Sequence, residues 1–158
     1  MVGLEASVKF FHTPKVEDDG VNVGWFEDQR YSSDEDGNSI DLPIAKVARW
    51  NEFGTKAGIP ERPFMRRAMM EHEQQWIELL KTLVQREIDK EKGTNIDAAL
   101  KKFGEQVAGD IQETILRGGF ARNAPSTLRR KGDKPPLIDT GIMISSIQAR
   151  TDKELLDV

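Results

Sequence analysis

Two long stretches of helical periodicity, separated by a short break at Gly93, constrain the fold of this chain most strongly. The first runs from about Pro63 to Lys90 and ends at Gly93. The second begins after a Thr94 or Asn95 cap and ends at Gly118 and Gly119. Apolar residues three and four apart place one apolar stripe on each helix: Met65, Met69, Trp76, Leu80, Leu83 or Val84, and Ile88 on the first, and Ile96, Leu100, Phe103, Val107, Ile111 and Ile115 on the second.

Shorter elements surround this helical pair. Residues 6–12 and 21–27 are rich in β-formers and predict two strands, and Asp41 with Pro43 predicts the start of a short helix that ends at Gly54. Residues 142–146 predict another short helix that runs into a strand near residues 147–150. Gly104 and Ala108, four residues apart, predict close approach of a neighbouring backbone, with tight helix packing as the simplest explanation. We therefore expect one α+β domain over 1–158, with two long amphipathic helices packed on a small mixed or antiparallel sheet, and extended loops.

Charge is unevenly distributed along the chain. The 158 residues carry a net charge of −4, and 32% of them are charged. Residues 28–41 predict an acidic flexible loop, in which the only base is Arg30. Residues 117–136 predict a basic loop rich in Pro and Gly, and within it residues 117–134 hold six bases and one acid. These segments are either solvated loops or unlike surfaces that meet between subunits, and the basic one is also able to face nucleic acid.

Motifs for catalysis or cofactor binding are missing from the sequence. It has no cysteine, its two histidines, His12 and His72, lie far apart, and no phosphate-binding glycine loop or metal-ligand spacing occurs. The acidic loop does not match the calcium-binding EF-hand pattern. We therefore expect no enzymatic activity, no cofactor and no metal. No apolar run approaches a membrane span and the N-terminus does not resemble a signal peptide, so we expect no membrane partner.

Two ordered motifs resemble the signatures of a known family. The first is Ile44-Ala-Lys-Val-Ala-Arg-Trp-Asn-Glu-Phe-Gly-Thr55 followed by Ile59-Pro-Glu-Arg-Pro-Phe-Met-Arg66. The second is Pro125-Ser-Thr-Leu-Arg-Arg-Lys-Gly132 followed by Lys134-Pro-Pro-Leu-Ile-Asp-Thr-Gly141 and Ser145-Ser-Ile147. Together they span roughly residues 40–150 and resemble the neck and tail-completion proteins of tailed bacteriophages, of the tail-component and virion-morphogenesis type.

This resemblance implies a structural component of the virion neck, which forms a ring at the head–tail junction or completes the tail for head joining. It implies as partners copies of the chain itself, the head connector and tail-tube or tail-terminator proteins, with DNA in the channel as a further candidate. The implied location is the virion neck or tail, after assembly in the host bacterial cytoplasm. The alternative is a nucleic-acid-binding module that uses residues 117–134.

We expect two groups of residues to contact subunits or partners. One lies in the first motif and its stiff Pro-rich loop, where Phe64 either anchors a neighbour or seats its own helix on the sheet. The other is the basic triplet, which we expect to be exposed because Pro125 and Pro135 keep it from joining a helix. The full set of candidates is Trp50, Asn51, Glu52, Phe53, Arg62, Phe64, Arg129, Arg130 and Lys131.

Overall fold

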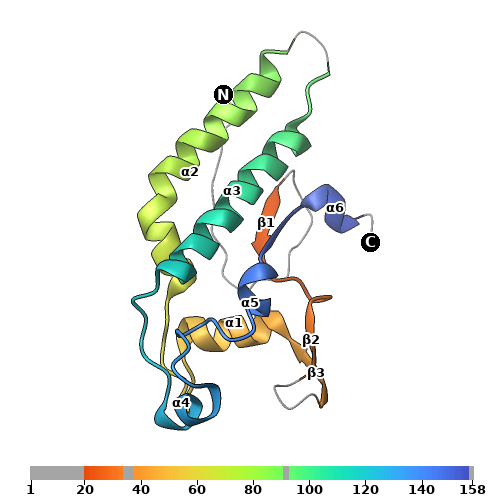
Figure 1. Ribbon diagram of the computed structural model, residues 1–158. Helices are drawn as coiled ribbons and strands as arrows, with labels where there is room; N and C mark the ends of the chain where they lie inside the picture. The colour runs from red at the N-terminus through yellow and green to blue at the C-terminus, as the bar shows by residue number, and fades with distance from the viewer. Residues whose placement is uncertain (1–19, 34–37, 91–92, 157–158) are drawn as a thin grey trace.

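The computed structural model describes residues 20–33, 38–90 and 93–156 (Figure 1). The elements follow the order β1 (Val21–Gly24), β2 (Arg30–Ser33), β3 (Ser39–Pro43), α1 (Ile44–Phe53), α2 (Phe64–Ile88), α3 (Ile96–Arg117), α4 (Pro125–Lys131), α5 (Ile142–Ser145), β4 (Gln148–Thr151) and α6 (Asp152–Leu156). The expected α+β class is confirmed, and the strands form two small antiparallel sheets, β1–β4 and β2–β3. Of the two strands predicted near the N-terminus, residues 6–12 lie outside the described residues and 21–27 contain β1.

Helix α3 is the central layer of the molecule. Helix α2 packs along one side of it to make a long hairpin, and the β1–β4 ribbon lies along another side (Figure 1). The predicted stripe on α3 is confirmed: Leu100, Val107, Ile111 and Ile115 are buried. The predicted stripe on α2 is wrong at the C-terminal end of the helix, where Ile88 is 57% exposed. The reason is that α2 is an outer layer: it covers α3, but little packs against its own last turns.

Gly104 explains how the sheet reaches α3. A Cβ atom at this position would lie 2.6 Å from the Cβ of Ala149 and 2.6 Å from a methyl carbon of Val21, so no side chain fits there. Val21 belongs to β1 and Ala149 to β4, and the two strands pair antiparallel with Val21 opposite Thr151. The predicted close approach at Gly104 is confirmed, but the neighbour is the sheet rather than another helix.

The segment predicted as an acidic loop, 28–41, contains secondary structure instead. Strands β2 and β3 pair antiparallel with Tyr31 opposite Leu42, while residues 34–37 lie outside the described residues. Tyr31 packs against the hydrophobic core and supplies the apolar contact that the sequence pattern did not reveal. Asp41 therefore lies in β3 and pairs with Arg30 rather than capping a helix, and α1 begins at Ile44.

The hydrophobic core lies where α1 meets the lower part of the hairpin. Ile44 and Ala48 of α1 pack there with residues of α2, α3 and α5. The indole ring of Trp25 stands edge-on to the ring of Phe64, with centroids 5.8 Å apart. Its Nε1 also donates a 2.7 Å hydrogen bond to the carbonyl oxygen of Met143, which ties the segment after β1 to α5.

Candidate functional site

The first motif ends with an acid that caps the long helix α2. Glu52, in the last turn of α1, is fully buried. Its carboxylate accepts hydrogen bonds from the backbone N–H groups of Met65 (2.9 Å) and Arg66 (3.2 Å) in the first turn of α2. These are donors that a helix leaves unpaired, and the positive end of the helix dipole favours a negative charge beside them. Glu52 therefore fixes where α2 begins and how it meets α1.

The same carboxylate also binds the side chain of Arg66. The Nε of Arg66 donates to Glu52 at 2.8 Å, and its terminal nitrogen donates both to the carbonyl oxygen of Glu52 and to the carboxylate of Glu61. The hydrogen bond to Glu52, together with that to Glu61, raises the pKa of the Arg66 guanidinium above its usual value. The guanidinium also stands 5.0 Å from the ring centre of Phe53.

Arg62 joins the first motif to the segment that leads into the second. Only 4% of it is exposed, and its backbone N–H donates to the carbonyl oxygen of Asn51 at 2.7 Å. Its guanidinium donates to the side-chain oxygen of Asn51 (2.6 Å), and to the carbonyl oxygens of Ala121 (2.8 Å) and Arg122 (3.2 Å) and the side-chain oxygen of Asn123 (3.1 Å). Residues near the end of α1 are thereby held to the segment that leads into α4.

All four of these acceptors are neutral oxygens rather than carboxylates. Burial of the positive charge therefore lowers the pKa of Arg62 from its usual value. Asn123 extends the connection, because its side-chain nitrogen donates to the carbonyl oxygen of Lys134 at 3.3 Å. The Asn51–Arg62–Asn123 chain thus links α1, the loop before α2 and the basic segment.

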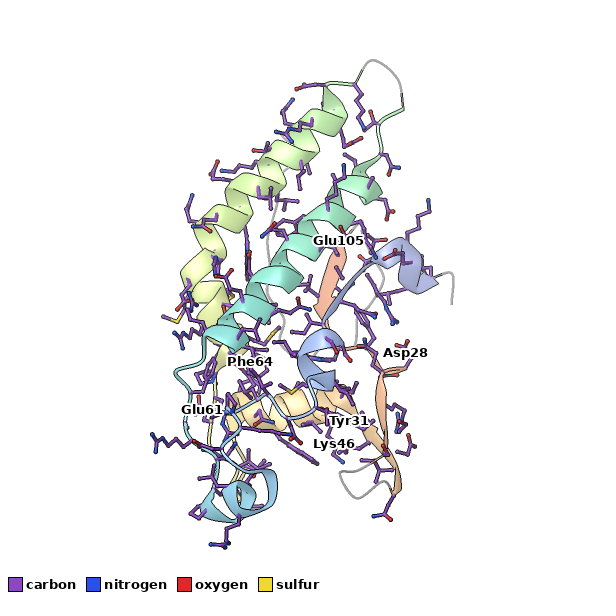
Figure 2. All side chains as sticks on the ribbon, in the orientation of Figure 1. Asp28, Tyr31, Lys46, Glu61, Phe64 and Glu105 are labelled. Carbon is purple, nitrogen blue, oxygen red and sulfur yellow. The ribbon has the colours of Figure 1, made fainter. Side chains whose placement is uncertain are left out.

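Four of the predicted contact residues face the interior of the chain. Glu52, Arg62 and Phe64 are buried, and Asn51 bonds to Arg62 and to the carbonyl oxygen of Val47. The expectation that the loop presents Arg62 and Phe64 to a neighbour is wrong for this structure, because both make their contacts within the chain. Phe64, labelled in Figure 2, instead lies at the start of α2. Its ring packs against Trp25.

The remaining aromatic candidates lie at the surface of α1. Trp50 is half-buried, and the ammonium group of Lys46 stands 5.1 Å from the centre of its ring. Phe53 is 45% exposed. Sequence reasoning missed Lys46 and Arg49, both exposed on this helix, although each lies four residues before an aromatic residue, Trp50 and Phe53 respectively, which was a usable signal.

The basic triplet belongs to a helix rather than to a loop. Residues Pro125–Lys131 form α4, with Pro125 in the first turn, so the expectation that the prolines keep the triplet out of a helix is wrong. Proline is favoured at the first position of a helix because its missing N–H would be unpaired there. Arg129 is exposed as expected, whereas the side chains of Arg130 and Lys131 lie outside the described part of the structure.

The two motif segments bring positive charge to one end of the molecule. Residues 44–66 contain five basic and two acidic residues, and residues 117–134 contain six basic and one acidic residue. Arg62 binds the two segments together, and α1 and α4 lie at the same end of the hairpin (Figure 1). We call this region, residues 44–66 with 117–134, the basic end; the chain as a whole carries a net charge of −4.

Comparisons with protein-family models, with curated proteins and with solved structures found no match to this chain. Among the described residues there is no group of three or more His, Cys, Asp and Glu side chains placed to hold a metal ion. None of the helices in the described ranges combines the length and apolarity needed to cross a membrane.

Proposed function

We propose that this protein is a non-catalytic structural component of a tailed-phage virion neck. In this role it forms a ring of identical copies at the head–tail junction, or completes the tail so that the tail can join the head. Its neighbours would be the head connector on one side and tail-tube or tail-terminator proteins on the other. Its location would be the neck or tail of the virion.

The observation that carries this proposal is the junction between the two family-like motifs. They are separated in sequence by two long helices, yet Arg62 of the first motif hydrogen bonds to three consecutive residues, 121–123, immediately before the second. Glu52 of the first motif caps α2. The first motif is therefore anchored to the segment that leads into the second, and Asn123 extends this connection to Lys134 within the second motif. This connection supports treating the two motifs as one signature rather than as two chance matches.

The buried junction also narrows the contact surface of the proposed ring. Asn51, Glu52, Arg62 and Phe64 position the elements. The surfaces left for neighbouring proteins therefore include the outward side of α1, with Trp50 and Phe53, and helix α4, with the exposed Arg129. Exposed cations at such surfaces affect the rate of encounter with a partner and the register in which the partner docks more than they affect affinity, and salt weakens this effect.

The experiment is complementation in the phage whose genome encodes this chain. Without the protein, we expect electron microscopy of lysates to show separate heads and tails, and joined particles to return when wild-type protein is supplied. The triple variant Arg129→Glu, Arg130→Glu, Lys131→Glu should fold but restore fewer joined particles. Normal yields of joined, infectious particles without the protein would refute the proposed function, whereas full rescue by the triple variant would remove only α4 from the contact surface.

A further inference from the structure

The basic end carries exposed cations that no acidic residue in the described ranges neutralises. Within the described residues, Lys46, Arg49, Lys56, Arg122 and Arg129 are exposed and form no ion pair. Other cations of this region are already engaged: Arg62 by neutral oxygens, Arg66 by Glu52 and Glu61, and Arg117 by Glu71.

The acids of the same region cannot balance these five charges. Glu52 is buried against the start of α2, and Glu61 is bound to Arg66. Asp133 is the third and last acidic residue of the basic end, and it is exposed. The basic end therefore presents a local surplus of positive charge on a protein whose remaining sequence is acidic.

The cations come from three separate places that the fold holds together. Lys46 and Arg49 lie on α1, Lys56 lies in the turn that follows it, and Arg122 and Arg129 lie on either side of the start of α4. The hydrogen bonds from Arg62 to Asn51 and to residues 121–123 fix α1 and the α4 segment relative to each other. Figure 2 labels Lys46 on α1 and Glu61 on the loop toward α2, both at this end of the molecule.

We propose that the basic end binds the phosphate backbone of double-stranded DNA, and that α1 supplies two of the five cations of this surface. An array of separated point charges suits a row of phosphates, which are contacted without reading the bases. Two of the five cations are lysines, a residue depleted in protein–protein interfaces but common in phosphate contacts. Trp50 adds an aromatic surface beside Lys46. This activity goes beyond a neck role and is testable on the isolated protein.

The experiment measures binding of the purified protein to a duplex of about 25 base pairs and arbitrary sequence, by fluorescence anisotropy between 50 and 200 mM salt. Each neutralised phosphate contributes about 0.9 to the slope of log affinity against log salt, so five cations set a limit of about 4 to 5 for its magnitude. The double variant Lys46→Gln, Arg49→Gln should bind more weakly and lower the slope by about 2. The matched control is Arg86→Gln, Lys102→Gln, which removes two exposed cations from the far end of the α2–α3 hairpin.

Three results would overturn the proposal. The first is no binding of wild-type protein at 50 mM salt. The second is a failure of the comparison between the two double variants. Either the α1 double variant folds and keeps the salt slope of wild type, or the control double variant loses as much affinity as the α1 double variant. The third is displacement of the duplex by polyglutamate of equal charge concentration, which would assign the surface to an acidic protein instead. Because these measurements need no virion, their outcome is independent of the complementation result.

Discussion

Replacing Glu52 with Gln removes one negative charge from the junction while it keeps the shape of the side chain. The buried carboxylate accepts two backbone N–H bonds and one from the Nε of Arg66, at 2.8 to 3.2 Å. A Gln amide has one oxygen for these three donors, and its NH₂ group has to face a donor. Hydrogen bonds to charged groups contribute about 1.5–3 kcal/mol each, but they are not additive here because Arg66 is 36% exposed and water takes up part of the loss.

We therefore expect Glu52→Gln to lower the free energy of unfolding by about 2–4 kcal/mol, a large part of the roughly 5–15 kcal/mol that holds a typical domain together. Urea denaturation followed by far-ultraviolet circular dichroism measures this as a lower midpoint at an unchanged m value. Glu61→Gln is the matched control, because Glu61 is exposed and its carboxylate bonds to the exposed side of Arg66, so it should cost less than about 1 kcal/mol. Equal stability of the two variants would refute the capping role of Glu52.

Three further predictions test other parts of the structure. Arg62→Met removes all four hydrogen bonds of the guanidinium, so it should speed hydrogen exchange of the amides in residues 121–131 and leave exchange in the middle of α3 unchanged. Exchange in residues 121–131 at the wild-type rate would contradict the role of Arg62 in holding this segment. Gly104→Ala should destabilise the protein by about 1–3 kcal/mol because the new Cβ meets the sheet, whereas Gly109→Ala, with open space around it, should be neutral or stabilising. Thermal melts in which Gly109→Ala has the lower melting temperature would contradict this packing. Burial raises the pKa of Tyr31 to about 12, so its neutral form contributes to the stability of the fold below about pH 10, and this contribution is lost as the pH rises toward 12. In urea titrations at several pH values, Tyr31→Phe should therefore lose less stability at alkaline pH than wild type does. An equal loss in both proteins would refute the assignment.

The sequence predicted the parts of the fold that depend on long periodicity. Helices α2 and α3 start and end within a few residues of their predicted limits, because an apolar stripe over six or seven turns is hard to produce by chance. The short elements were less predictable. Strands β2 and β3 depend on the contact of Tyr31 with a core built from distant residues, and no local pattern encodes that contact.

The sequence singled out residues of the candidate site but did not reveal which of them face the interior. The motif letters indicated that Glu52, Arg62 and Phe64 matter, but the same residue types suit either an exposed contact surface or a buried junction. Only the fold shows that Arg62 has oxygen acceptors from residues 121–123, almost sixty residues along the chain. In the sequence, Pro125 indicated a helix break, but in the structure it starts α4. A proline is harmless in the first turn of a helix, because its missing N–H would have no partner there.

The most direct test of the proposed neck role is a density map of the intact virion at a resolution that shows helices. The account predicts a ring of copies at the head–tail junction, in which the α2–α3 hairpin and the short α1 and α4 helices are recognisable in every subunit. It also predicts that α1 or α4 contacts a neighbouring protein or the DNA. A complete virion with no density for this chain at the junction or in the tail would contradict the account.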